Sequence, residues 1–119
     1  MNSKFINRIK IPAALIALLF FTLQLAGCSS VQVGRDFDVQ LFNSSVKANV
    51  TTRNQVQNWL GEPGSTGFSL DKDGELSTEW MYFYGAGTLS NMKNAKLKIL
   101  QIRFNKNGIV NSYNWSNSK

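Results

Sequence analysis

Residues 52–63, Thr-Arg-Asn-Gln-Val-Gln-Asn-Trp-Leu-Gly-Glu-Pro, carry the signals for the start, the buried face and the end of one helix. Thr52 and Gln55 form a capping box, in which each side chain bonds the backbone N–H of the other residue. Three apolar residues follow at the i, i+3, i+4 spacing of one helix face: Val56, Trp59 and Leu60. Gly61 is typical of the residue after a helix, and Pro63 cannot continue one. This stretch therefore predicts a short helix that buries one face.

The residues just before it, 36–48, predict a second helix. Apolar residues recur there at roughly helical spacing: Phe37, Leu41 and Val46. Asp36 or Asp38 can cap the first turn and complement the helix dipole. Asn49 tolerates the left-handed conformation in which many helices end.

After Pro63 the apolar pattern changes to the two-residue alternation of strands. We expect strands over residues 67–70, 75–84, 96–104 and 109–115. Turn residues at 71–74 and an Asn-Gly pair at 107–108 separate them, and residues 88–94 are expected to form a polar loop. Two helices followed by an antiparallel meander of three to four strands predict an α+β domain, with both helices on one face of the sheet.

The first 27 residues have the three parts of a secretory signal peptide. A basic start precedes an apolar stretch over residues 11–26, and small residues follow. The basic residues are Lys4, Arg8 and Lys10. A membrane-spanning helix is the alternative, but it needs about 20 apolar residues, and polar or helix-breaking residues interrupt this shorter stretch. The interruptions are Pro12, Thr22 and Gln24.

Residues 25–28, Leu-Ala-Gly-Cys, resemble a bacterial lipobox. The resemblance implies a thioether-linked diacylglycerol on Cys28, cleavage between Gly27 and Cys28, and a third acyl chain on the new amino group. Each buried methylene contributes about 0.8 kcal/mol, so two or more chains anchor a protein stably. In lipoproteins of this kind an Asp after the Cys retains the protein in the inner membrane. Ser29 instead points to the outer membrane, with the domain facing the periplasm.

The composition excludes several kinds of site. The 119 residues contain one Cys and no His, which rules out the usual zinc sites, an intramolecular disulfide and a Ser-His-Asp triad. We expect no metal, no cofactor and no catalysis. Removal of residues 1–27 lowers the net charge from +6 to +3, because ten basic and all seven acidic residues remain. That modest charge and the export signal argue against a nucleic-acid partner.

The motif around the best-defined helix resembles the signature of the SmpA/OmlA (BamE-like) family of bacterial outer-membrane lipoproteins. In that signature a Thr is followed by Val and then by Leu-Gly-x-Pro, although the family usually has Gly where this chain has Asn49. The matching residues are Val50, Thr52, Val56, Leu60, Gly61 and Pro63. The resemblance implies a signal peptide over residues 1–27, a lipidated Cys with a short tether over 28–34, and a BamE-like domain over 35–119.

The same resemblance implies a non-catalytic binding or scaffold module, accessory to envelope or outer-membrane β-barrel protein assembly. Its partners would be the membrane, through the anchor on Cys28, and an envelope protein such as the β-barrel assembly machinery. One alternative is an inhibitor-like or mobile-element lipoprotein that uses the same fold on another envelope protein. Another is a small envelope hydrolase. It is disfavoured because Glu75 and Glu79 lie about 13 Å apart on a strand, too far for a shared acid/base site.

A basic segment near the third strand is the candidate contact with a membrane or partner. It contains Lys93, Lys96, Lys98 and Arg103. Each Lys or Arg near an anionic membrane surface adds about 1 kcal/mol of attraction. The alternative interpretation is a strand at the edge of the sheet, where charges prevent aggregation.

Overall fold

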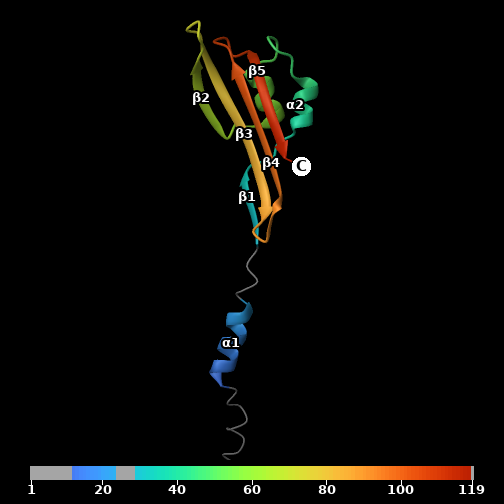
Figure 1. Ribbon diagram of the computed structural model, residues 1–119, viewed down its shortest axis with the longest axis vertical. Helices are drawn as coiled ribbons and strands as arrows, with labels where there is room; N and C mark the ends of the chain where they lie inside the picture. The colour runs from blue at the N-terminus through green and yellow to red at the C-terminus, as the bar shows by residue number, and fades with distance from the viewer. Residues whose placement is uncertain (1–11, 24–28, 119) are drawn as a thin grey trace, which may run out of the picture.

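A computed structural model describes residues 12–23 and 29–118 of the chain (Figure 1). The expected cleavage after Gly27 and the expected lipidation at Cys28 lie outside the described residues. Helix α1, Ala13–Leu23, has 11 residues and lies within the apolar stretch of the expected signal peptide. None of the helices in the described ranges is long and apolar enough to cross a membrane.

Helix α2, Val39–Ser45, is shorter than the expected 36–48. Asp38 is its N-cap, and Oδ1 of Asp38 accepts a 2.9 Å hydrogen bond from the Leu41 N–H. The helix stops early because weak helix formers occupy its last turn and Val46 is already extended, with ψ 137°. Asn49 has φ 65°, the left-handed conformation we expected, but in the turn that follows the helix.

Helix α3, Arg53–Leu60, confirms the helix predicted from residues 52–63. The N–H of Gln55 donates to Oγ1 of Thr52 at 3.3 Å, and the N–H of Thr52 donates to Oε1 of Gln55 at 2.9 Å. Both halves of the capping box are therefore formed. Gly61 is the C-cap with φ 78°, a conformation that glycine adopts without steric cost.

Five strands form one antiparallel sheet, one more than the three to four expected. They are β1 (Ser30–Gly34), β2 (Ser65–Leu70), β3 (Leu76–Thr88), β4 (Asn91–Phe104) and β5 (Val110–Ser118). Strands β2 to β5 pair in sequence order, which confirms the meander and the α+β class. Strand β1 pairs with the second half of β3, on the edge where β2 pairs with its first half.

The core lies between the two helices and one face of the sheet. Residues directly opposite each other on antiparallel strands share a face, so Tyr82, Leu100 and Trp115 form one row and Trp80, Ile102 and Tyr113 the next. The buried apolar side chains are Phe37, Val39, Phe42, Val56, Leu60, Tyr82, Leu100, Ile102, Phe104 and Val110. Figure 1 shows α2 and α3 in the half of the sheet that lies away from the β3–β4 turn.

Two expectations about connecting segments were wrong. The expected tether over residues 28–34 is largely strand β1, whose residues 30–34 pair with residues 84–88 of β3. The expected polar loop over 88–94 is a tight turn at Leu89 and Ser90 between two long strands. Strand β3 continues past its expected end at residue 84, through Gly85 and Gly87, because strands pair with it on both sides, β1 on one edge and β4 on the other.

Candidate functional site

One end of the sheet is formed by β1 and the β3–β4 hairpin, and we call it the anchor end. It comprises residues 29–34, 84–88 and 89–97. The N–H of Leu89 donates a 2.7 Å hydrogen bond to the carbonyl oxygen of Ser29. The residue that follows Cys28 in the sequence is therefore held at the tip of the hairpin. In Figure 1 this is the lower end of the sheet, on the side where α1 is drawn.

The structure divides the four basic candidate residues into two pairs. Lys98 forms an ion pair with Asp36 at 2.7 Å, and Arg103 forms one with Glu79 at 2.6 Å. The Lys98 hydrogen bond lowers the pKa of the Asp36 carboxyl below its usual value. These two cations therefore have intramolecular partners and serve the fold.

Lys93 and Lys96 are exposed and form no ion pair with any described residue. Both lie on the part of β4 that extends beyond β5, because β5 pairs with β4 only from Leu97 onward. The edge-strand interpretation therefore fits this short segment but is wrong for Lys98 and Arg103, which lie between two paired strands. Lys93 and Lys96 are the two cations of the segment that are available to an external anion.

The second half of β3 and all of β4 and β5 contain no acidic residue. The last carboxylate in the sequence is Glu79, and no Asp or Glu follows it. Three carboxylates instead lie in or beside the β2–β3 turn, at the end of the sheet opposite the Leu89 turn: Asp71, Asp73 and Glu75. Lys93 and Lys96 thus lie near the anchor end, whereas the far end carries these three carboxylates together with two lysines of its turns, Lys72 and Lys106.

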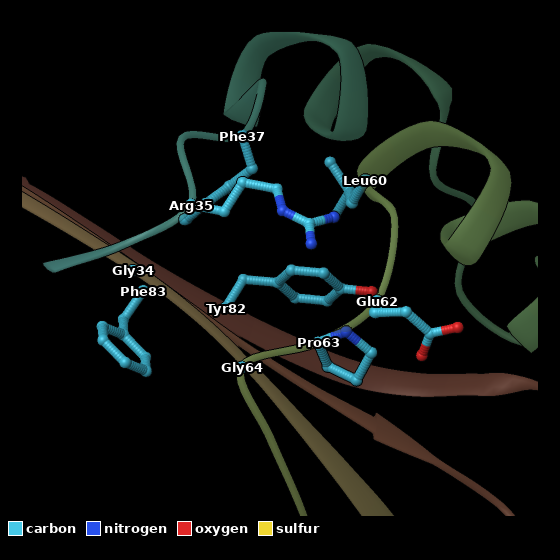
Figure 2. Close-up of a pocket in the computed structure, with 9 residues that line it drawn as sticks. All are labelled: Gly34, Arg35, Phe37, Leu60, Glu62, Pro63, Gly64, Tyr82 and Phe83. Carbon is cyan, nitrogen blue, oxygen red and sulfur yellow. The ribbon is translucent and has the colours of Figure 1, made fainter.

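A cleft lies beside the end of α3, between the β1–α2 connection and β3 (Figure 2). Figure 2 shows the Arg35 side chain crossing over the Tyr82 ring toward Leu60. The Tyr82 hydroxyl donates a 2.9 Å hydrogen bond to the carbonyl oxygen of Gly61. The cavity volume is about 130 Å³, whereas pockets for small-molecule ligands usually measure about 300–1,000 Å³. A volume of this size suits a single side chain or a few water molecules.

The six motif residues are not equivalent in the structure. Thr52 caps α3, Val56 and Leu60 are buried beneath it, and Gly61 ends it. Pro63 lines the cleft, but Val50 is 64% exposed and lies outside the core. The buried residue of that turn is Thr51, whose Oγ1 accepts a 2.8 Å hydrogen bond from the N–H of Lys47. The motif thus accounts for the cap, the buried face and the end of α3.

The two acidic side chains considered for a hydrolase, Glu75 and Glu79, lie apart from each other. Among the described residues no group of three His, Cys, Asp or Glu side chains lies close enough to hold a metal ion. Glu79 is paired with Arg103 on the face of the sheet away from the helices, and Glu75 follows the β2–β3 turn. The two carboxylates that could suggest a hydrolase therefore lie in separate surroundings.

Comparisons with family models, with curated proteins and with solved structures found no match to this chain.

Proposed function

We propose that the chain is a bacterial lipoprotein, acylated at Cys28 and held on the periplasmic side of the outer membrane. Its BamE-like domain acts as a non-catalytic binding module accessory to envelope protein assembly. The observation that carries the proposal is the hydrogen bond between Leu89 and Ser29, because it places the residue after the proposed lipid attachment at one end of the sheet. The rest of the domain extends away from that point.

The distribution of charge supports this orientation. Lys93 and Lys96 lie on the anchor end and form no ion pair with a described residue, whereas the β2–β3 turn at the other end carries three carboxylates and one lysine, Lys72. Each lysine close to an anionic headgroup contributes about 1 kcal/mol of attraction. The attraction is screened within about 10 Å at moderate salt, so only cations held near the membrane experience it. A short connection to the anchor satisfies that condition.

The far end of the sheet supports the binding role. Three large apolar side chains there are strongly exposed on the helix-bearing face: Phe68 (76%), Leu70 (67%) and Leu76 (55%). Leu70 and Leu76 are a directly opposite cross-strand pair, and Phe68 lies on the same face of β2. Clustered apolar side chains of this kind mark protein contact surfaces more often than isolated ones. The element order, two helices and then a meander, supports the BamE-like assignment.

The anchoring part is tested by metabolic labelling with a fatty-acid probe in a Gram-negative host. The unchanged chain is expected to take up the probe, and Cys28→Ala is expected to remain unlabelled. Ser29→Ala is the matched control and should label normally. Label on the Cys28→Ala protein would contradict acylation at this residue.

The binding part is tested by cross-linking followed by affinity capture from detergent-solubilised outer membrane. We expect subunits of the β-barrel assembly machinery to be recovered, and a Phe68→Ser, Leu70→Ser variant to recover less of them. Recovery of a different envelope protein in their place would support the inhibitor-like alternative.

A further inference from the structure

We propose that the tip of the β3–β4 hairpin enters the membrane, with the Leu89 side chain at the boundary between headgroups and acyl chains. This inference rests on the proposed lipid anchor at Cys28. It adds a second, protein-mediated contact with the bilayer and fixes the orientation of the whole domain.

The first argument is position. A flexible tether of six residues would let the domain move about 20 Å from its anchor. Instead, Ser30 pairs with Thr88, and the carbonyl of Ser29 accepts the Leu89 N–H at 2.7 Å. Cys28 is covalently bonded to Ser29, so a lipid on Cys28 is attached one residue along the chain from the residue that bonds the hairpin tip. Acyl chains on that residue hold the tip at the membrane surface.

The second argument is the chemistry of the turn. The two turns at the far end use polar residues and a glycine with positive φ: Gly74 at 78° and Gly108 at 76°. Asp71 and Asn105 also accept backbone hydrogen bonds within those turns. The turn at Leu89 and Ser90 has neither a glycine with positive φ nor a side chain that accepts backbone hydrogen bonds. It presents Leu89, which is 68% exposed, where a polar residue would suit water better.

The third argument is the composition around the tip. Thr88, Ser90 and Asn91 are uncharged and exposed, so no charge has to leave water when Leu89 enters the interface. Val31 adds 42% exposed apolar surface, because the residue opposite it, Gly87, has no side chain to cover it. Lys93 and Lys96 follow on β4, at the depth of anionic headgroups. An exposed leucine among uncharged residues, with cations behind it, matches the polarity profile of an anionic bilayer.

The inference has a consequence for the partner. Strand β3 has 13 residues, which at 3.3 Å per residue span about 40 Å. With Leu89 in the interface, the exposed cluster of Phe68, Leu70 and Leu76 is presented about 40 Å from the bilayer when the strands stand upright. The partner surface then faces the periplasm at a fixed height.

The test uses the acylated full chain, purified from a Gram-negative envelope. Acylation blocks the thiol of Cys28, so the new thiol of Leu89→Cys is the only reactive one and can carry a bimane fluorophore. Lys106→Cys, in the far β4–β5 turn, is the matched control. Each labelled protein is reconstituted in phosphatidylethanolamine and phosphatidylglycerol vesicles that contain nitroxide-labelled lipid.

We expect blue-shifted, strongly quenched fluorescence at position 89 and water-like, unquenched fluorescence at position 106. An acylated protein with equal, water-like signals at both positions would overturn the tip contact and leave the lipid anchor intact. An unacylated Cys28, seen in the mass spectrum of the same sample, would overturn both proposals.

A second variant tests the leucine itself. Ser90→Cys carries the fluorophore, and Leu89→Asp or the control Leu76→Asp is added to it. Leu89→Asp is expected to abolish lipid quenching at position 90, whereas Leu76→Asp leaves it unchanged. Both side chains are exposed, so both variants are expected to stay folded, which circular dichroism verifies. Undiminished quenching with Leu89→Asp would contradict insertion of this side chain.

Discussion

The hydroxyl of Tyr82 donates a 2.9 Å hydrogen bond to the carbonyl oxygen of Gly61, 21 residues earlier in the chain. This bond joins the end of α3 to the middle of β3. The ring of Tyr82 is buried and also contacts the ring of Phe37, with 5.8 Å between centroids. One side chain therefore connects the end of α3 and the segment that precedes α2 to the sheet, at the wall of the cleft.

Tyr82→Phe is expected to lower the free energy of unfolding by about 1 kcal/mol, because the hydrogen bond is lost and the ring contact stays. Tyr113→Phe is the matched control. The Tyr113 ring packs on Phe42, and loss of its hydroxyl should change the free energy of unfolding little. Urea titration of both variants gives the comparison. A Tyr82→Phe protein as stable as Tyr113→Phe would contradict the structural role of the bond.

The free energy of unfolding of Tyr82→Phe should depend on alkaline pH differently from that of the unchanged chain. Burial raises the pKa of Tyr82 in the folded state above its usual value near 10. The unfolded chain therefore loses this proton first, and the contribution of Tyr82 to stability is complete below pH 10 and declines above it. The stability difference between the unchanged chain and Tyr82→Phe should shrink as pH rises past 10. A difference independent of pH would contradict the assigned burial.

Thr52→Ala is expected to destabilise the domain by about 1 kcal/mol, because the Gln55 N–H loses its acceptor at the start of α3. Thr52→Ser keeps the hydroxyl and should retain most of the stability. Thermal unfolding of the two variants separates the hydrogen bond from the methyl group. Equal losses of stability in Thr52→Ala and Thr52→Ser would show that the cap oxygen does not stabilise the helix.

Gly34→Ala is expected to release β1 from the sheet. An added Cβ would lie 2.2 Å from the carbonyl oxygen of Phe83, and the residue also has φ 77°. Gly74→Ala is the matched control, because its φ is 78° but a Cβ there meets nothing within 4 Å. Backbone strain alone should cost about 1–2 kcal/mol in both. Amide exchange at Leu89 should accelerate only in Gly34→Ala, and protection that persists there would contradict the docking of β1.

Lys93→Gln with Lys96→Gln is expected to reduce the preference of the acylated chain for anionic over neutral vesicles. Two cations at about 1 kcal/mol each correspond to roughly a 10- to 30-fold change in partition. Lys98→Gln is the control, because Lys98 already forms an ion pair with Asp36. Vesicle competition at low and high salt measures the effect. An equal loss in Lys98→Gln would mean that the ion pair does not distinguish these lysines.

Local signals predicted α3 almost residue by residue, because its cap, its apolar face and its terminal glycine all lie within residues 52–63. The meander was also predictable from alternation and from turns such as the one at Gly108. The early end of α2 follows from weak helix formers in its last turn. In each case the determining interactions are close in sequence.

Strand β1 was missed because its partner is remote in sequence, and the β3–β4 turn was missed because polar residues around it are typical of a loop. The alternation Ser-Val-Gln-Val over residues 30–33 is a strand signal, but its partner lies more than 50 residues away. The same holds for the basic segment, since the Lys98 bond to Asp36 spans 62 residues. A pattern of charges along one strand does not reveal which of them will find a carboxylate from another element.

The central claim is that the domain is held by lipid at Cys28, with the hairpin tip beside the attachment point. The most direct measurement is the intact mass and N-terminal peptide of the chain isolated from a Gram-negative outer membrane. The account predicts that residues 1–27 are absent and that Cys28 carries a thioether-linked diacylglycerol and an amide-linked acyl chain. A retained N-terminal segment or an unmodified Cys28 thiol would contradict it.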